Sequence, residues 1–164
     1  MLKTHAIRTI ANVRELYKSY NAAIRDDRNV YYFDNVFPAN SSEDLLFGET
    51  TILPGNVNQE CFFTKGHVHN TPAAEVYYCI SGEGIILKQF PDGTTSIELI
   101  DAGSSVYIEP NVVHRAINTG KSELKLYCVC RADAGHNYDV KINTRVFDRR
   151  SHNEENVCIE SKYN

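Results

Sequence analysis

Short apolar runs separated by turn residues make up the chain from Val30 to Arg131. The runs are rich in Val, Ile, Tyr, Phe and Cys, which favour strands. Ser81–Gly84 and Phe90–Thr94 have the composition of tight turns between two such runs. We expect strands near residues 30–36, 45–53, 59–64, 74–81, 84–90, 95–100, 104–108, 113–118 and 123–131. So many short strands at this spacing predict an all-β sandwich or barrel.

Two further segments flank the strands. Apolar residues recur at three- and four-residue steps from Ile7 to Ile24, which predicts an amphipathic helix over roughly residues 8–25. The chain has 164 residues, a length that suits one domain with one core. We therefore expect an N-terminal helical extension over residues 1–29, a β-barrel over residues 30–150 and a polar C-terminal tail over residues 151–164.

Charge and hydropathy exclude several classes of partner. The net charge of −4 and the absence of a long basic run argue against nucleic acid. No apolar stretch approaches the length of a membrane span, and the first residues lack the apolar core of a secretory signal. The cysteines are odd in number, and most lie in apolar runs: Cys61, Cys79, Cys128, Cys130 and Cys158. Reduced, buried thiols of this kind are typical of a cytoplasmic protein.

Three histidines and a glutamate form the strongest chemical pattern in the chain. His67 and His69 are two residues apart, so in a strand their side chains point to the same face. Glu75 follows a turn and can fold back beside them, and His114 belongs to a separate predicted strand that would lie adjacent. Such a set of three nitrogens and one carboxylate suits divalent Fe, Mn, Ni, Co or Zn. A single histidine is usually structural, but this combination predicts a metal site.

The same residues resemble the two motifs of the cupin superfamily, and more closely those of the cupin-type phosphoglucose isomerases. The first motif is matched by Gly66, His67, His69, Glu75 and Gly82, and the second by Gly103, Pro110, His114 and Asn118. The isomerase signature adds Thr51, Pro54, Glu60, Thr64 and Tyr77, together with the later stretch 132–138. The resemblance covers roughly residues 30–140. The interval from His69 to Glu75 is one residue shorter than in the family signature, and Cys130 replaces a tyrosine of the family's sugar site.

The resemblance implies a fold, a reaction and a set of site residues. The fold would be a single cupin jelly-roll β-barrel, paired as a homodimer. The reaction would be the interconversion of glucose 6-phosphate and fructose 6-phosphate in glycolysis and gluconeogenesis. One divalent metal, Fe2+ foremost or else Mn2+, Ni2+ or Zn2+, would be held by His67, His69, Glu75 and His114. Glu75 and His136 would be catalytic, and the sugar phosphate would be bound by Thr51, Thr64, Gly66, Tyr77, Tyr138 and one of Tyr31 or Tyr32, with Tyr32 the first choice.

Two alternatives keep the barrel and change the chemistry. A cupin with this ligand set can be a dioxygenase or decarboxylase, which would consume dioxygen with Fe(II) and show no isomerase activity. A non-catalytic cupin would bind a sugar phosphate without turnover. Within the isomerase hypothesis the hydrogen can move between C1 and C2 by proton transfer through a base or by a hydride shift, and the sequence does not choose between them.

Overall fold

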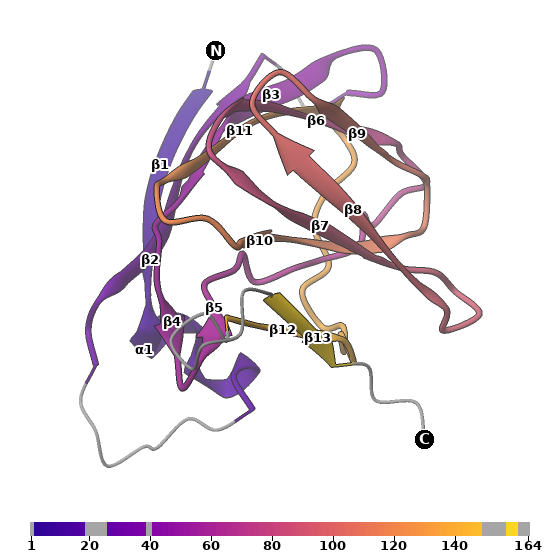
Figure 1. The fold of residues 1–164 in the computed structure, drawn as a ribbon. Coiled ribbons are helices and arrows are strands. Elements are labelled where there is room, and N and C mark those ends of the chain that lie inside the picture. The colour runs from indigo at the N-terminus through magenta and orange to yellow at the C-terminus, as the bar shows by residue number, and fades with distance from the viewer. Residues whose placement is uncertain (1, 19–25, 39–40, 149–156, 161–164) are drawn as a thin grey trace.

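Strands dominate the computed structural model, which describes residues 2–18, 26–38, 41–148 and 157–160 (Figure 1). The largest sheet has six strands, in the order β1 (Leu2–Thr9), β2 (Asn29–Phe37), β3 (Leu45–Ile52), β11 (Leu124–Arg131), β6 (Glu75–Ser81) and β9 (Ser105–Ile108). A sheet of three strands orders β10 (Val113–Asn118), β7 (Glu83–Gln89) and β8 (Thr95–Asp101). A third sheet orders β13 (Val157–Glu160), β12 (Arg145–Asp148), β5 (Glu60–Cys61) and β4 (Asn56–Val57).

The first two sheets face each other and enclose the main core, as the two walls of a jelly-roll barrel (Figure 1). Every strand pairing in them is antiparallel. Burial alternates residue by residue along β6 and β11, so one face of the large sheet packs inward and the other is open. Ile52 and Leu126 from the large sheet and Ile86 and Ile117 from the small one are almost fully buried in this core. The predicted all-β barrel is confirmed.

The expected strands recur with boundaries shifted by at most one residue, with one exception. Only Glu60 and Cys61 of the predicted strand 59–64 form a regular strand, and Phe63 continues as a single bridge to Ile117. The strands that sequence patterning missed are β1, β4, β12 and β13. Three of them are at most four residues long, and β1 lies within residues 1–29, where we expected a helical extension without strands.

The predicted helix over residues 8–25 is wrong in its extent. Residues 2–9 form β1, which pairs along its whole length with β2 at the edge of the large sheet. The helical part is one short α1 (Ile10–Val13) followed by a 3-10 turn over Arg14–Leu16, and residues 19–25 lie outside the described part of the chain. The apolar spacing was real, because Ile10, Val13 and Tyr17 are buried in the core, but it reflects a compact turn under the barrel.

The C-terminal segment also contributes to a sheet. Residues 157–160 of the expected polar tail form β13, which is antiparallel to β12, while residues 151–156 and 161–164 lie outside the described residues. β12 in turn contacts β5 through Phe147 and Glu60, so this sheet lies at one end of the barrel (Figure 1). Within the described residues no helix is long and apolar enough to cross a membrane.

Candidate metal centre

The backbone brings together two ligands that are distant in sequence. His67 and His114 form an antiparallel bridge in which the His67 N–H donates to the His114 carbonyl at 3.1 Å and the His114 N–H donates to the His67 carbonyl at 2.9 Å. Thr64 continues this pairing by donating its N–H to the Ala116 carbonyl at 2.9 Å. The segment from Thr64 to His67 is therefore held against β10, and the imidazoles of His67 and His114 lie on the same side of this pairing.

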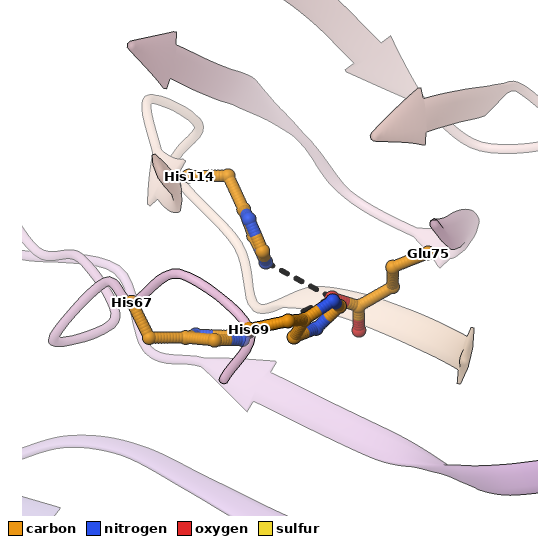
Figure 2. A group of neighbouring side chains, drawn as sticks. All are labelled: His67, His69, Glu75 and His114. Atoms are coloured by element: carbon orange, nitrogen blue, oxygen red, sulfur yellow. Dashed lines mark hydrogen bonds and ion pairs between the residues drawn. The ribbon is translucent and has the colours of Figure 1, made fainter. Parts of the chain in front are cut away.

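The four predicted ligands converge on one point (Figure 2). One potential donor atom from each of His67, His69, Glu75 and His114 lies within 4.8 Å of the others. Glu75 Oε2 is 2.9 Å from His114 Nε2, 3.4 Å from His69 Nε2 and 4.0 Å from His67 Nε2. The loop from His69 to Glu75, although one residue shorter than in the family signature, still delivers the carboxylate to the histidines.

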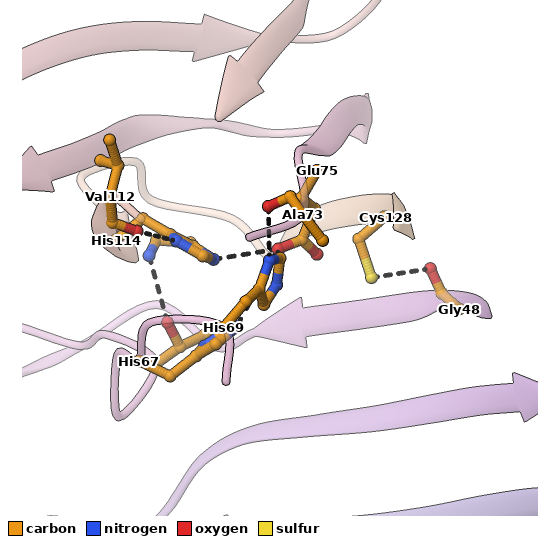
Figure 3. A network of polar contacts seen from close by, with 10 residues as sticks. Gly48, His67, His69, Ala73, Glu75, Val112, His114 and Cys128 are labelled. Carbon is orange, nitrogen blue, oxygen red and sulfur yellow. Dashed lines mark hydrogen bonds and ion pairs between the residues drawn. The ribbon is translucent and has the colours of Figure 1, made fainter. Parts of the chain in front are cut away.

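Backbone carbonyls orient two of the imidazoles (Figure 3). The Nδ1 of His69 is 2.8 Å from the Ala73 carbonyl and that of His114 is 3.0 Å from the Val112 carbonyl. A carbonyl can only accept, so each Nδ1 carries the proton and each Nε2 presents its lone pair to the centre. This is the usual way in which a protein orients a metal-binding histidine.

The site passes a direct test for a cation. The Nε2 atoms of His67 and His69 are buried and have no hydrogen-bond partner. A buried polar atom without a partner costs free energy, and a metal ion between these nitrogens and the Glu75 carboxylate would remove that cost. The residues present therefore form a group that can bind a metal ion.

Protonation states match this role. Burial alone would raise the pKa of Glu75, but the close approach of His114 and His69 outweighs it and holds that pKa well below its usual range. Burial lowers the pKa of His67 well below its ordinary value. At neutral pH the glutamate is thus a carboxylate and His67 a neutral imidazole, the forms that coordinate metals.

A cavity of about 180 Å³ opens above these ligands. Of the residues predicted from the sequence, its walls include Thr64, Gly66, His67, Glu75, Tyr77, His136 and Tyr138. The His136 ring lies 4.4 Å from the His67 ring and is stacked on Tyr138 with an interplanar angle of 12°. Burial lowers the pKa of His136, so its imidazole is neutral at pH 7.

Two expected substrate contacts lie elsewhere. Thr51 is fully buried outside the cavity, with its hydroxyl 3.4 Å from Glu49 Oε1, and the cavity is lined by Thr50 in its place. Tyr32 pairs with Thr51 and is also absent from the cavity wall, which Tyr31 lines. Alternation explains both shifts, since neighbouring residues of a strand point to opposite faces.

Lys65 is a pocket residue that sequence reasoning missed. It lines the cavity, its ammonium lies 5.1 Å from the centre of the Tyr138 ring, and its N–H donates to the Tyr31 hydroxyl at 3.4 Å. The signal was available, because Lys65 lies between Thr64 and Gly66, both of which were expected to bind the sugar phosphate. Cys130 packs instead in a small separate cluster with Leu46 and contributes nothing to the cavity wall.

Comparison with known proteins identifies the relatives of this chain. The family model described as glucose-6-phosphate isomerase (GPI) matches residues 3–163. The glucose-6-phosphate isomerase of Thermococcus onnurineus (strain NA1) is 38% identical over 122 residues, which are 74% of this chain and 65% of that protein. That of Thermococcus gammatolerans (strain DSM 15229 / JCM 11827 / EJ3) is 35% identical over 136 residues, 80% of this chain and 72% of that protein. The chain thus spans less than two thirds of the first of these relatives.

Solved structures resemble the fold alone. Peruvianin-I, a cysteine peptidase from Thevetia peruviana latex, superimposes with a TM-score of 0.57 at 18% identity and covers 69% of each chain. An oxalate oxidase in complex with the substrate analogue glycolate gives a TM-score of 0.54 at 13% identity, over 84% of this chain and 55% of the other.

A jelly-roll barrel that gathers three histidines and a glutamate at the base of a cavity defines a cupin with a candidate metal centre. Among cupins, the match over residues 3–163 shows that the chain belongs to the glucose-6-phosphate isomerase family.

Proposed function

We propose that the chain interconverts glucose 6-phosphate and fructose 6-phosphate and serves glycolysis and gluconeogenesis. The observation that carries the proposal is the candidate metal centre at the base of a cavity whose walls hold His136, Tyr138 and Lys65. Family membership and the names of the two Thermococcus relatives support the same reaction.

The residues divide the chemistry between them. A divalent cation held by His67, His69, Glu75 and His114 would polarise the sugar carbonyl and stabilise negative charge on its oxygens. His136 is a neutral imidazole beside the centre, so we assign it the proton transfer at the ring oxygen that opens the sugar. Glu75 would be the base if the hydrogen moves between C1 and C2 as a proton.

The phosphate group would bind at the Lys65 side of the cavity. The Thr64 oxygen already accepts the Ala116 N–H at 3.1 Å, so its own O–H is available to donate. Lys65 supplies a positive charge, and Gly66 and Tyr138 line the same wall. Tyr77 lies deeper, next to the ligand His114 with ring centres 6.0 Å apart, where it would contact the reacting end of the sugar.

We propose Fe2+ as the resident metal, with Mn2+, Ni2+ and Zn2+ as the alternatives that the nitrogen and carboxylate donors also accept. The test is to remove metal with a chelator, restore each ion separately and measure fructose 6-phosphate conversion. Conversion that returns only with metal supports the proposal, and equal rates in metal-free protein contradict it. Dioxygen consumption without isomerase activity would indicate an oxygenase, and sugar phosphate binding without turnover a binding protein.

The route of the hydrogen has its own test. Conversion in deuterium oxide followed by mass spectrometry counts the deuterium that enters at C1 or C2. Transfer through Glu75 allows exchange with solvent, whereas a hydride shift retains the original hydrogen. We propose the proton route, because Glu75 lines the cavity that would hold the sugar.

We also propose a homodimer that forms through the open face of the large sheet. Val76 pairs with Tyr107 and Tyr78 with Tyr127 across neighbouring strands, and all four side chains are exposed. A monomer rarely leaves such a continuous apolar face in water, and two copies related by a twofold axis would cover each other's. Light scattering should give twice the chain mass, and Tyr78→Lys should give the monomer.

We propose a cytoplasmic location on the state of the cysteines. Cys79, Cys128 and Cys130 are buried and form no disulfide, as is typical of reduced thiols in the cytoplasm. Fractionation of cells with an antibody against the chain would test it, and recovery with membranes or in the medium would contradict it.

A further inference from the structure

A second cavity, of about 210 Å³, lies apart from the metal centre. It is lined by Glu15, Leu16, Arg115, Val140, Lys141, Ile142, Asn143 and Arg145. His114 and Arg115 are neighbours on β10 and point to opposite faces, so His114 serves the metal centre and Arg115 serves this cavity. The reaction proposed above uses none of the side chains in this cavity.

Arg115 is a buried cation with unused hydrogen-bonding capacity. Its side chain is 6% exposed and its guanidinium lies 4.2 Å from the centre of the Phe63 ring. Nη2 donates to the Lys65 carbonyl at 2.9 Å, but Nε is buried without any partner. A buried charge is costly unless it is paired, and among the described residues no carboxylate forms an ion pair with Arg115.

Glu60, the carboxylate that acts electrostatically on Arg115, is already engaged by other groups. Glu60 accepts a hydrogen bond from Arg145 at 2.7 Å and another from the Lys18 N–H at 2.9 Å. One buried carboxylate thus faces two guanidinium groups, and one positive charge is left over. At the mouth of the cavity Glu15 and Lys141 are both exposed and opposite in sign, so they do not change this balance.

We propose that this cavity binds a small oxyanion, either inorganic phosphate or a small phosphate monoester, through Arg115 with help from Arg145 and Lys141. Phosphate oxygens suit the guanidinium group, which binds them through charge-assisted hydrogen bonds. The volume holds several waters at about 30 Å³ each, which is ample for one phosphate group. Water could satisfy the Arg115 Nε but would leave the surplus charge uncompensated.

The location of the anion is tested by crystallography with an anomalous scatterer. Crystals of the full chain grown with selenate should show an anomalous peak within hydrogen-bonding distance of the Arg115 guanidinium. A cavity that contains only water, or a peak that appears only beside Lys65 in the first cavity, would overturn the proposal.

Solution binding tests it independently. Calorimetric titration with inorganic phosphate is made on a Lys65→Met background, which removes the cation of the first cavity, and should show saturable binding that weakens at least tenfold when Lys141→Glu is added and disappears when Arg115→Met is added. Lys121→Glu makes the same charge change on an exposed turn and should bind as the Lys65→Met background does. Lys65→Met by itself should leave this binding intact.

The same series separates the possible outcomes. Phosphate binding that is lost in Lys65→Met but unchanged in Lys141→Glu would place the phosphate in the first cavity and overturn the proposal. If Arg115→Met does not fold, the exposed Lys141→Glu still decides the question. Glycerol phosphate replaces inorganic phosphate in a second titration. If glycerol phosphate binds tenfold more tightly than inorganic phosphate, the site is assigned to a phosphate monoester. If glycerol phosphate binds more weakly, the site is assigned to free phosphate.

Discussion

His67 and His114 exchange two backbone hydrogen bonds, so the same contact that pairs their strands also sets the spacing of two predicted metal ligands. Neither imidazole can shift along its strand without breaking this bridge. The Thr64 N–H bond to Ala116 extends the pairing on one side. The geometry of the centre is thereby built into the barrel and does not depend on side-chain contacts alone.

His114→Ala should abolish tight metal binding and lower isomerase turnover by more than about 100-fold, since loss of a ligand costs more than loss of an outer partner. The metal content after dialysis and the rate of fructose 6-phosphate formation measure the two effects. His5→Ala is the matched control, because His5 is exposed and contacts only Asp34 and Tyr32 among the described residues. Full metal content and full activity in His114→Ala would show that the centre lies elsewhere.

Thr50→Val should raise the KM for the sugar phosphate several-fold, whereas Thr51→Val should leave KM unchanged. Thr50 lines the first cavity, but the Thr51 hydroxyl contacts Glu49 on the far side of β3. Steady-state kinetics on the two variants separate the positions. The opposite result would mean that β3 presents its other face to the substrate.

Gly66→Ala should destabilise the chain more than Gly103→Ala. Both glycines have positive φ, at +78° and +90°, so both substitutions carry backbone strain of about 1 kcal/mol or more. At Gly66 the added Cβ would also lie 2.6 Å from Ile142 Cδ1, whereas at Gly103 nothing lies within 4 Å. Urea unfolding of both variants measures the difference, and equal losses would rule out the steric contribution.

The metal-free protein should lose stability as the pH falls from about 7 to about 5. Burial places the folded pKa of both His67 and His136 below the unfolded value, so the unfolded chain binds more protons in this window. Burial also opposes protonation of His69, but its contact with the Glu75 carboxylate raises that pKa overall and offsets part of the loss. Thermal unfolding across this range should show a flatter slope in His136→Gln than in the unaltered chain. An unchanged slope in His136→Gln would contradict the lowered pKa of His136.

Side-chain periodicity predicted most of the barrel because β-strands with one buried face repeat every two residues. The predicted strands at β2, β3 and β6 to β11 match closely. The prediction of a helix over residues 8–25 was wrong because Ile10, Val13 and Tyr17 follow a helical spacing within a short turn. β1 could not be found locally, since its stability depends on pairing with β2.

The spacing of His67, His69, Glu75 and His114 was sufficient to predict a metal site, because ligand chemistry limits which residues can form one. Only the tertiary structure showed that Thr50 and Tyr31 face the cavity while Thr51 and Tyr32 do not, since a shift of one residue along a strand reverses the side that a side chain faces. The sequence likewise could not predict that Arg115 is a buried positive charge without an ion-pair partner among the described residues. The burial and the ion pairing of Arg115 depend on residues such as Glu60 and Arg145, which are distant in sequence and come together only in the fold.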